Sequence, residues 1–186
     1  RPLPTSFHSC TTVSRVTTDI FILGGFQTDF ARNYAKQGLE ISDLVADVVA
    51  GTLANAQIEA TDIETIHVGN AFGQLFNGQG QLGGMPATVE PGLWGVPAAR
   101  HEAACASGGI AILAAMAEIE AGRYDVQCVV GVEQMKTVNA SVGGDFLGTA
   151  AWYELEAKGV EFPFPKLFGK LGDEYDKRYG LKDEHL

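Results

Sequence analysis

Cys105 has the position in this sequence that best suits chemistry, because an extended segment meets a predicted helix there. The stretch HEAACASGG (101–109) surrounds it with small residues, and IAILAAMAEIEAG (110–122) follows with a helical composition. Unpaired N–H groups and the helix dipole stabilise a thiolate at such a place. Small neighbours also let a substrate carbonyl approach the sulfur and backbone amides that would bind an oxyanion. Cys105 is therefore either a nucleophile, which we favour, or a packing residue at a tight turn.

A cysteine nucleophile needs a base, and no histidine of this chain is clearly placed to act as one. His101 precedes Cys105 by four positions on an extended segment, which separates the two side chains by roughly 13 Å along a strand. His67 alternates with Ile66 and Val68 as in a strand, so we expect it to be structural. The proton acceptor would then come from elsewhere.

The other cysteines and one glycine motif favour structural roles. Cys128 lies among valines in a predicted strand and should be a core residue, whereas Cys10 has no identifiable role. Three cysteines without CxxC spacing argue against a disulfide framework or a metal site, and fit a reducing compartment. GQGQLG (78–83) matches GxGxxG, but it does not directly follow a strand, and Pro86 interrupts the expected helix. A flexible or closely packed loop is a better interpretation than a dinucleotide site.

Composition limits the class of protein. The 186 residues are 46% apolar and 19% charged, which is typical of a soluble globular protein. The longest strictly apolar run, 110–117, is too short to span a bilayer. A net charge of −10 argues against binding to nucleic acid. Residues 158–186 carry 6 basic and 6 acidic side chains, whereas 1–157 carry 7 and 17. We expect a solvated mixed-charge helix in this last stretch, with contact to an anionic ligand as the alternative.

Hydrophobic patterning predicts an α/β fold with a parallel sheet. We expect strands at 19–25, 65–71 and 125–133, a further extended segment at 97–104, and helices at 41–53 and 107–121. Ser42 and Asp43 are placed to cap the first of these helices. The second helix is apolar nearly all round, which predicts that it is buried. Strands and helices in this order form βαβ units, and hence a βαβαβαβ arrangement.

Composition and hydrophobic pattern divide the chain into three parts. Residues 1–18 are rich in Ser and Thr and form a leader, which we expect to be disordered rather than a transit-peptide remnant. Residues 19–142 form the α/β domain, in which 72–95 is an elaborate connection with at most a short helix. The helical pattern breaks down afterwards, and 143–186 is expected to begin a loop or cap domain.

Several of these segments resemble the N-terminal half of a thiolase, from about residue 19 to residue 148. CASGG after a short strand carries the resemblance, together with the Ala-rich helix and VGVEQMK (130–136). FQTDFAR (26–32) resembles the Arg-Thr-Pro-Phe-like segment of thiolases. EAAC (102–105) is more similar to the sterol-carrier-protein-2-type and archaeal-type thiolases than to the biosynthetic ones. Ketoacyl synthases share the fold and an active cysteine, but their local sequences differ.

The resemblance implies acyl transfer between coenzyme A thioesters, by thiolysis of a 3-ketoacyl-CoA or by condensation. Cys105 would be the acylated nucleophile and its own N–H part of an oxyanion hole, with Ala106, Ser107 and Gly108 supporting the turn. No metal and no covalently bound cofactor is implied, and the partners would be acyl-CoA and other subunits of a homodimer or tetramer. The fold would be a five-layered αβαβα structure made of two similar halves, with 143–186 starting the domain that covers coenzyme A.

Thiolases carry in their second half a histidine that activates the nucleophile, an Asn–His pair and a second cysteine. None of these motifs occurs in this sequence, so we expect the C-terminal half to come from the same or another chain. Two alternatives stay open, a non-catalytic thiolase-like subunit for assembly or acyl-CoA binding and a ketoacyl-synthase-like condensing enzyme. We expect a cytoplasmic location, with mitochondria or peroxisomes as alternatives, and no association with nucleic acid or membranes.

Overall fold

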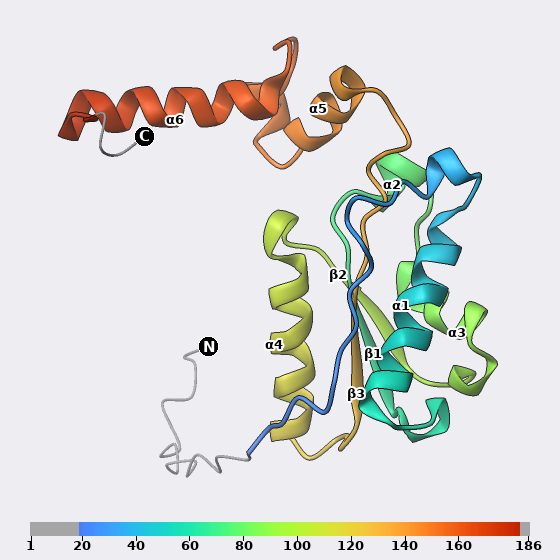
Figure 1. The fold of residues 1–186 in the computed structure, drawn as a ribbon. Coiled ribbons are helices and arrows are strands. Elements are labelled where there is room, and N and C mark those ends of the chain that lie inside the picture. The colour runs from blue at the N-terminus through green and yellow to red at the C-terminus, as the bar shows by residue number, and fades with distance from the viewer. Residues whose placement is uncertain (1–18, 183–186) are drawn as a thin grey trace, which may run out of the picture.

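A computed structural model describes residues 19–182. Its centre is a parallel sheet of three strands, arranged in the order β2–β1–β3, with helices on both faces (Figure 1). The strands are β1 (Thr65–Gly69), β2 (Ala98–His101) and β3 (Gln127–Gly131). The helices are α1 (Ile41–Ala56), α2 (Gly73–Asn77), α3 (Met85–Val89), α4 (Ser107–Glu120), α5 (Ala140–Gly148) and α6 (Pro163–Tyr179). The predicted α/β class with a parallel sheet is confirmed.

Strand β1 is the centre of the sheet and is buried along its whole length. Ile66 lies opposite Ala98 of β2 and Cys128 of β3, so both neighbours run parallel to it. Its residues alternate between the two faces of the sheet. Ile66 and Val68 belong to the aliphatic core on the side of α1 and α3, which includes Ile41, Val45, Val49, Leu82 and Leu93. Thr65, His67 and Gly69 alternate with them and so face α4.

Helix α1 confirms the helix expected at 41–53, but a different residue caps it. Glu40 is the N-cap, and its side chain and that of Asp43 each accept a backbone N–H of the other residue. Ser42 therefore lies inside the helix rather than at its start. The reciprocal cap satisfies two of the N–H groups that every helix start leaves unpaired.

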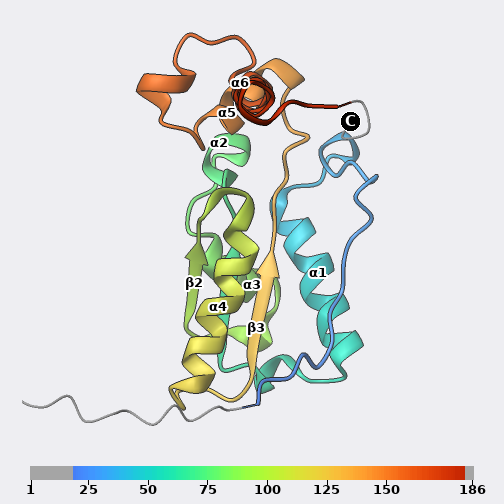
Figure 2. The ribbon, with the colours of Figure 1, turned by 90° about the vertical axis from the view of Figure 1, so that its left-hand side faces the viewer.

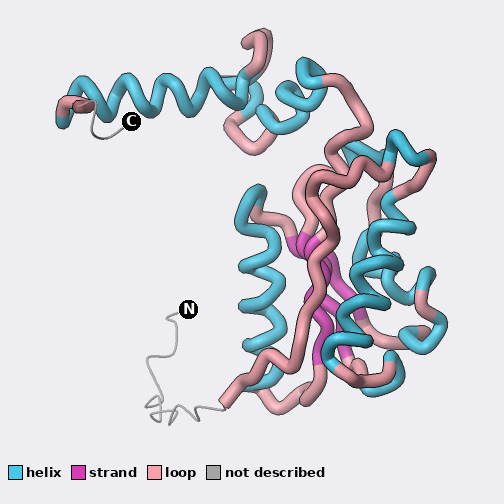
Figure 3. The backbone as a smooth tube through the Cα atoms, viewed as in Figure 1, coloured by secondary structure: helices cyan, strands magenta, loops and turns pink. Residues whose placement is uncertain are grey.

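The strand expected at 19–25 is absent from the described structure. Figure 3 draws this segment as loop, and Ile22 is 92% exposed. The segment is attached to α1 instead of the sheet, because Gly25 N–H donates to Asn55 Oδ1 at 3.0 Å. Arg32, further along, pairs with Asp47 Oδ2 at 2.7 Å. The prediction was wrong because an apolar run needs a neighbouring strand to become part of a sheet, and here no such pairing is made.

Helix α4 is less buried than its composition predicts. It places small residues against the sheet, since Ser107, Ala111 and Ala115 are its buried positions. Its larger side chains lie outward, and Leu113 is 58% exposed. Figure 2 shows α4 lying across the open face of the sheet with no further layer over it within the described residues. The expectation of a fully buried helix is therefore wrong for this chain alone.

The connection between β1 and β2 is more ordered than predicted. It holds two short helices, α2 and α3, as well as two 3₁₀ turns. Pro86 is in the first turn of α3, where its missing N–H costs nothing. Gly83 packs on β2, because a Cβ there would lie 2.9 Å from Ala99 C. The GxGxxG stretch is thus a closely packed connection, as the sequence favoured.

The last part of the chain lies beyond the ends of the strands. Asn139 caps the start of α5, since its side chain accepts from Val142 N–H at 3.0 Å, and α6 extends away from the sheet (Figure 1). The boundary predicted at residue 143 falls inside α5 and stays a prediction. The leader 1–18 lies outside the described residues. Between residues 19 and 182, no helix is both long and apolar enough to cross a bilayer.

The contact between β1 and α4 generates a test. A Cβ added at Gly69 would lie 2.8 Å from Gly108 Cα, so Gly69→Ala should push the helix off the sheet. We expect a loss of about 1–3 kcal/mol in the free energy of unfolding, as for other overpacked cores. Denaturant titration measures this loss.

Gly109→Ala is the matched control, because a Cβ there meets nothing within 4 Å. It should leave stability unchanged or raise it by up to about 1 kcal/mol, since Ala favours a helix over Gly. Equal effects of the two substitutions would contradict the close approach of β1 and α4.

Candidate active site

Cys105 lies in a short 3₁₀ turn, Ala104–Ala106, which joins the carboxyl end of β2 to the start of α4. Its thiol is free and exposed. In open parallel sheets, ligands bind beyond the carboxyl ends of the strands, which is where this turn lies. The start of α4 directly follows, so the helix dipole acts on the same spot.

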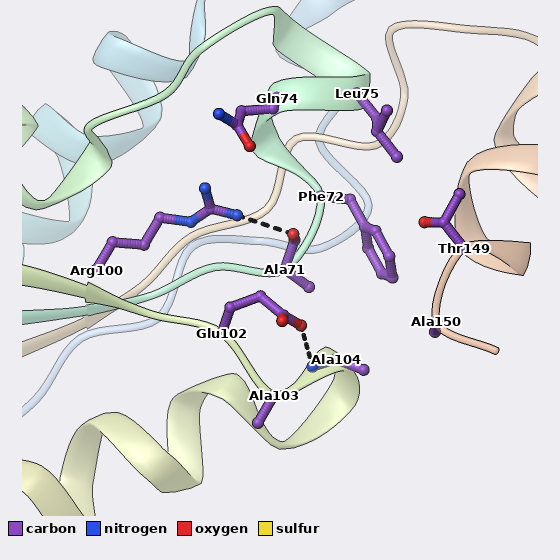
Figure 4. Close-up of a pocket in the computed structure, with 10 residues that line it drawn as sticks. All are labelled: Ala71, Phe72, Gln74, Leu75, Arg100, Glu102, Ala103, Ala104, Thr149 and Ala150. Carbon is purple, nitrogen blue, oxygen red and sulfur yellow. Dashed lines mark hydrogen bonds between the residues drawn. The ribbon is translucent and has the colours of Figure 1, made fainter. Parts of the chain in front are cut away.

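The turn contains a strained residue next to the cysteine. Ala104 has φ +47°, in the left-handed region that residues with a side chain rarely adopt. This conformation costs roughly 1–2 kcal/mol for a residue other than glycine. It bends the chain sharply between Ala103 and Cys105. Glu102 supports the bend, because its carboxylate accepts the N–H of Ala104 (Figure 4).

Ser107 ties the turn together from the first position of α4. Its Oγ accepts the N–H of Ala103 at 3.0 Å and donates to the carbonyl of Ala104 at 2.6 Å. The N–H of Ala106 donates to Ala103 O at 2.9 Å, and that of Ser107 to Ala104 O. These two amides hold the turn and are not available as oxyanion donors. Gly108 is part of the close contact between α4 and β1, since its backbone lies next to Gly69.

A cavity of about 660 Å³ lies beside the turn. It is lined by Ala71, Phe72, Gln74, Leu75, Arg100, Glu102, Ala103, Ala104, Thr149 and Ala150 (Figure 4). The lining residues come from the carboxyl ends of β1 and β2, from α2 and from the segment after α5. Cys105 itself is not among them, but its neighbours Ala103 and Ala104 are. The cavity therefore reaches the cysteine turn without enclosing the thiol.

Arg100 brings a positive charge to this cavity in a chain of net charge −10. Its Nη2 donates to Ala71 O at 2.9 Å and its Nε to Asn70 O at 3.2 Å. These bonds hold the planar guanidinium against the end of β1. An arginine has five N–H donors, so donors beyond these two remain for a ligand that brings carbonyl or phosphate oxygens.

Glu133 holds the backbone of Ala71 and Phe72, two residues that line the cavity. Its Oε2 accepts the N–H groups of Ala71 and Phe72 at 2.9 and 3.1 Å, and its Oε1 accepts from Asn70 Nδ2 at 3.1 Å. Asn70 is 1% exposed, and it also bonds Val132 O and Gly73 N. The carboxylate therefore fixes the backbone that positions Phe72 at the cavity.

The segment from residue 20 to residue 182 matches the family described as thiolase, N-terminal domain. This chain belongs to the thiolase family. It is 32% identical over 168 residues to the acetyl-CoA acetyltransferase of Methanocaldococcus jannaschii, covering 90% of this chain and 41% of that protein. It is 30% identical over 169 residues to the acetyl-CoA acetyltransferase of Methanothermobacter thermautotrophicus, covering 90% and 42%.

A third relative is human sterol carrier protein 2, which is 27% identical over 178 residues, covering 90% of this chain and 31% of that protein. The chain spans about two fifths of the length of the two acetyltransferases. Both groups of relatives agree with the thiolase types to which the EAAC stretch is similar.

The two histidines of this thiolase domain bond to each other. His67 Nδ1 and His101 Nε2 lie 2.8 Å apart, and His67 is 4% exposed. Burial, and then the neighbouring His67, lower the pKa of His101. The structural role expected for His67 agrees with these contacts. No bond joins either ring to Cys105 among the described interactions.

Cys128 is a core residue, as predicted. It lies in β3, and burial raises the pKa of its thiol to about 11. It is therefore protonated and unreactive at neutral pH. Cys10 lies outside the described residues. Within residues 19–182, no group of three or more His, Cys, Asp and Glu side chains is arranged to hold a metal ion.

Sequence reasoning missed three features of the site. The left-handed Ala104 gives no signal in the sequence, because alanine rarely adopts that conformation. Glu133 had a signal, since it is an acidic residue two positions after the end of β3, at the carboxyl end of the parallel sheet where sites form. Arg100 had a weaker signal, because it is a charged residue next to the last position of β2.

The strained turn leads to a prediction about the stability of two Ala→Gly variants. Ala104→Gly and Ala106→Gly lose similar backbone entropy, but only Ala104 has a positive φ. We expect Ala104→Gly to be more stable than Ala106→Gly by about 1 kcal/mol, because glycine removes the strain. Denaturant titration of both variants measures the difference. If Ala104→Gly costs as much as Ala106→Gly, the left-handed turn is not present in solution.

Proposed function

We propose that this chain is the N-terminal half of an acyltransferase that moves an acetyl or longer acyl group between coenzyme A thioesters through an acyl-enzyme on Cys105. One observation carries the proposal. An exposed cysteine lies in a strained turn at the start of a helix, beside a cavity of about 660 Å³, in a chain of the thiolase family. The acetyl-CoA acetyltransferases among its relatives support the substrate class.

The first half of the reaction would be acylation of the cysteine. The thiolate of Cys105 attacks the thioester carbonyl, a new bond forms between sulfur and carbon, and the bond to the coenzyme A sulfur breaks. Coenzyme A leaves as its thiolate and takes up a proton. The dipole of α4 favours the attacking thiolate, because the helix begins two residues later. In the second half, the carbanion of an acyl-CoA takes the acyl group, a carbon–carbon bond forms and the bond to the cysteine sulfur breaks. Thiolysis is the reverse: the carbon–carbon bond of a 3-ketoacyl-CoA breaks as Cys105 takes the acyl group, the acyl-CoA carbanion takes up a proton, and coenzyme A then takes the acyl group from the cysteine.

The cavity would hold the part of the substrate nearest the thioester. Phe72 and Leu75 supply apolar surface, while Arg100 supplies donors for carbonyl or phosphate oxygens. Thr149 and Ala150 close the cavity from the side of α5. This supports the idea that residues 143–186 begin the domain over coenzyme A.

The proton acceptor would come from a C-terminal thiolase half, in the same or another chain. The outward face of α4 supports this, because Ile110, Ile112 and Leu113 are 41%, 50% and 58% exposed. A second half lying on this face would complete a five-layered structure. We propose a homodimer or tetramer of such units in the cytoplasm, with mitochondria or peroxisomes as the alternative locations.

A non-catalytic thiolase-like subunit is the second candidate. It is favoured by the absence of a base in contact with Cys105 among the described residues. Such a subunit would bind acyl-CoA or assemble with a partner without being acylated. A ketoacyl-synthase-like condensing enzyme would be acylated but would not carry out thiolysis.

Acetylation of Cys105 tests the proposal. The complete assembly is incubated with acetyl-CoA, and intact-protein mass spectrometry should find one acetyl group, mapped to Cys105 by digestion. Cys105→Ala should abolish the adduct with little loss of stability, because the side chain is exposed. An unmodified wild-type protein would overturn the enzymatic proposal. An adduct without thiolysis of acetoacetyl-CoA would favour the condensing relative.

Cys128→Ser is the matched control. It should keep the adduct on Cys105, since Cys128 is buried in β3 away from the turn. It should also lower the free energy of unfolding by about 1–3 kcal/mol, because a hydroxyl replaces a thiol in an apolar strand. Loss of the adduct in Cys128→Ser would contradict the assignment of the nucleophile.

A further inference from the structure

A partly buried polar cluster joins α4 to all three strands, on the face of the sheet opposite the aliphatic core. His67 of β1 is at its centre. Its Nδ1 lies 2.8 Å from His101 Nε2 of β2, and its Nε2 lies 3.1 Å from Glu118 Oε2 of α4 and 3.0 Å from Gln127 Oε1 of β3. The reaction proposed above uses none of these groups.

The contacts determine where the protons lie. Gln127 Nε2 donates to Ala115 O at 2.9 Å, so its Oε1 is the atom that faces His67. Both neighbours of His67 Nε2 are then acceptors, and this nitrogen must carry a proton. In neutral His67 the Nδ1 is consequently an acceptor. His101 must therefore carry its proton on Nε2 and donate it to His67.

The cluster acts on the helix that begins beside the nucleophile. Ala115 and Glu118 lie in the second half of α4, whereas Gly108 contacts Gly69 at its start. These two attachments set the depth and the tilt of the helix on the sheet. The turn that holds Cys105 is continuous with the first residue of α4, so a shift of the helix moves the thiol.

We propose that His67 is a positioning residue, which together with His101 and Glu118 locks the nucleophile helix to the sheet, and that the lock holds only while at most one of the two imidazoles is protonated. The link to catalysis rests on the proposed acyltransferase function. The lock itself does not, because it concerns only the contacts within this chain.

The limit of one proton follows from the geometry. One extra proton leaves the bond between the rings intact, because one ring can still donate across the 2.8 Å contact while the other accepts. A second proton leaves two N–H groups facing each other over 2.8 Å, so the bond is lost. In the described part of the chain, Glu118 from α4 is the charged group that contacts the pair, and β3 contributes uncharged Gln127.

The pH dependence of folding tests the lock without any substrate. Burial lowers the pKa of His101 below its value in the unfolded chain, which is about 6.5. The unfolded state then binds more protons, so stability should fall as the pH drops below about 6.5 and level off once His101 is protonated in the folded state. Denaturant titration at a series of pH values measures this fall.

His101→Gln is the diagnostic variant for the pH measurement, because the glutamine amide can donate to His67 Nδ1 but does not titrate. Below neutral pH, the free energy of unfolding of this variant should depend less on pH than that of the wild-type protein. An unchanged fall in His101→Gln would overturn the proposal. Long-range ¹H–¹⁵N spectra of the full assembly should also place the proton of both neutral rings on Nε2, and a different tautomer of His67 would overturn it as well.

The rate of Cys105 acylation tests the positioning role. His67→Phe keeps a ring of similar size but loses the bonds, and it should lower the rate at saturating acetyl-CoA roughly ten- to hundredfold, with KM nearly unchanged. His67→Gln, whose amide offers a donor and an acceptor, should restore part of the rate. It also replaces His67→Phe if that variant fails to fold.

Val45→Ala is the matched control, since Val45 is buried on the opposite face of the sheet. It should lower stability without lowering the rate of acylation. An equal rate loss in Val45→Ala would show that His67 acts through stability alone, and would overturn the positioning role. If the wild-type protein is not acylated at all, the proposed function fails, while the pH and tautomer measurements still decide whether the lock exists.

Discussion

The close contact between β1 and α4 is the constraint on which the rest of this structure depends. A Cβ on Gly69 would clash with the backbone of Gly108, and Ser107, Ala111 and Ala115 continue a small-residue face along the helix. Dispersion forces fall steeply with distance, so the close contact depends on Gly69 and on these small buried residues. The cysteine turn is attached to the first residue of that helix. Its position therefore follows from the packing of backbone on backbone.

Much of the fold could be predicted because local patterns matched the tertiary contacts. The period of aliphatic residues in α1 and the apolar runs of β1 and β3 both correspond to elements in the structure. The segment 19–25 has an equally apolar run, but a strand is defined by its neighbours and none pairs with it here. Hydrophobicity alone cannot distinguish an unpaired extended segment from a strand.

The candidate site, like the fold, could be predicted only in part. The location of Cys105 between an extended segment and a helix could be predicted, since both neighbours have clear sequence patterns. The brace from Glu133 to Ala71 and the bond from His67 to His101 could not, because they join residues 62 and 34 positions apart. The alternation in TIHVG gave a partial signal. Its aliphatic residues face one side of the sheet, which leaves Thr65, His67 and Gly69 for the side where polar contacts form.

Helix α4 packs on the sheet with its inner face and exposes its outer face, and the two faces have opposite requirements. This arrangement links the covering of α4 by a partner to the position of Cys105. The inner face is small and polar, so it can hold the helix at a fixed depth through hydrogen bonds and backbone contacts. The outer face has large exposed apolar side chains, which is typical of a surface that another layer covers. A partner half that covers the outer face would also press α4 onto the sheet. It would then bring the missing base and fix the nucleophile by one contact, so an uncovered chain would be both less stable and poorly positioned for acyl transfer.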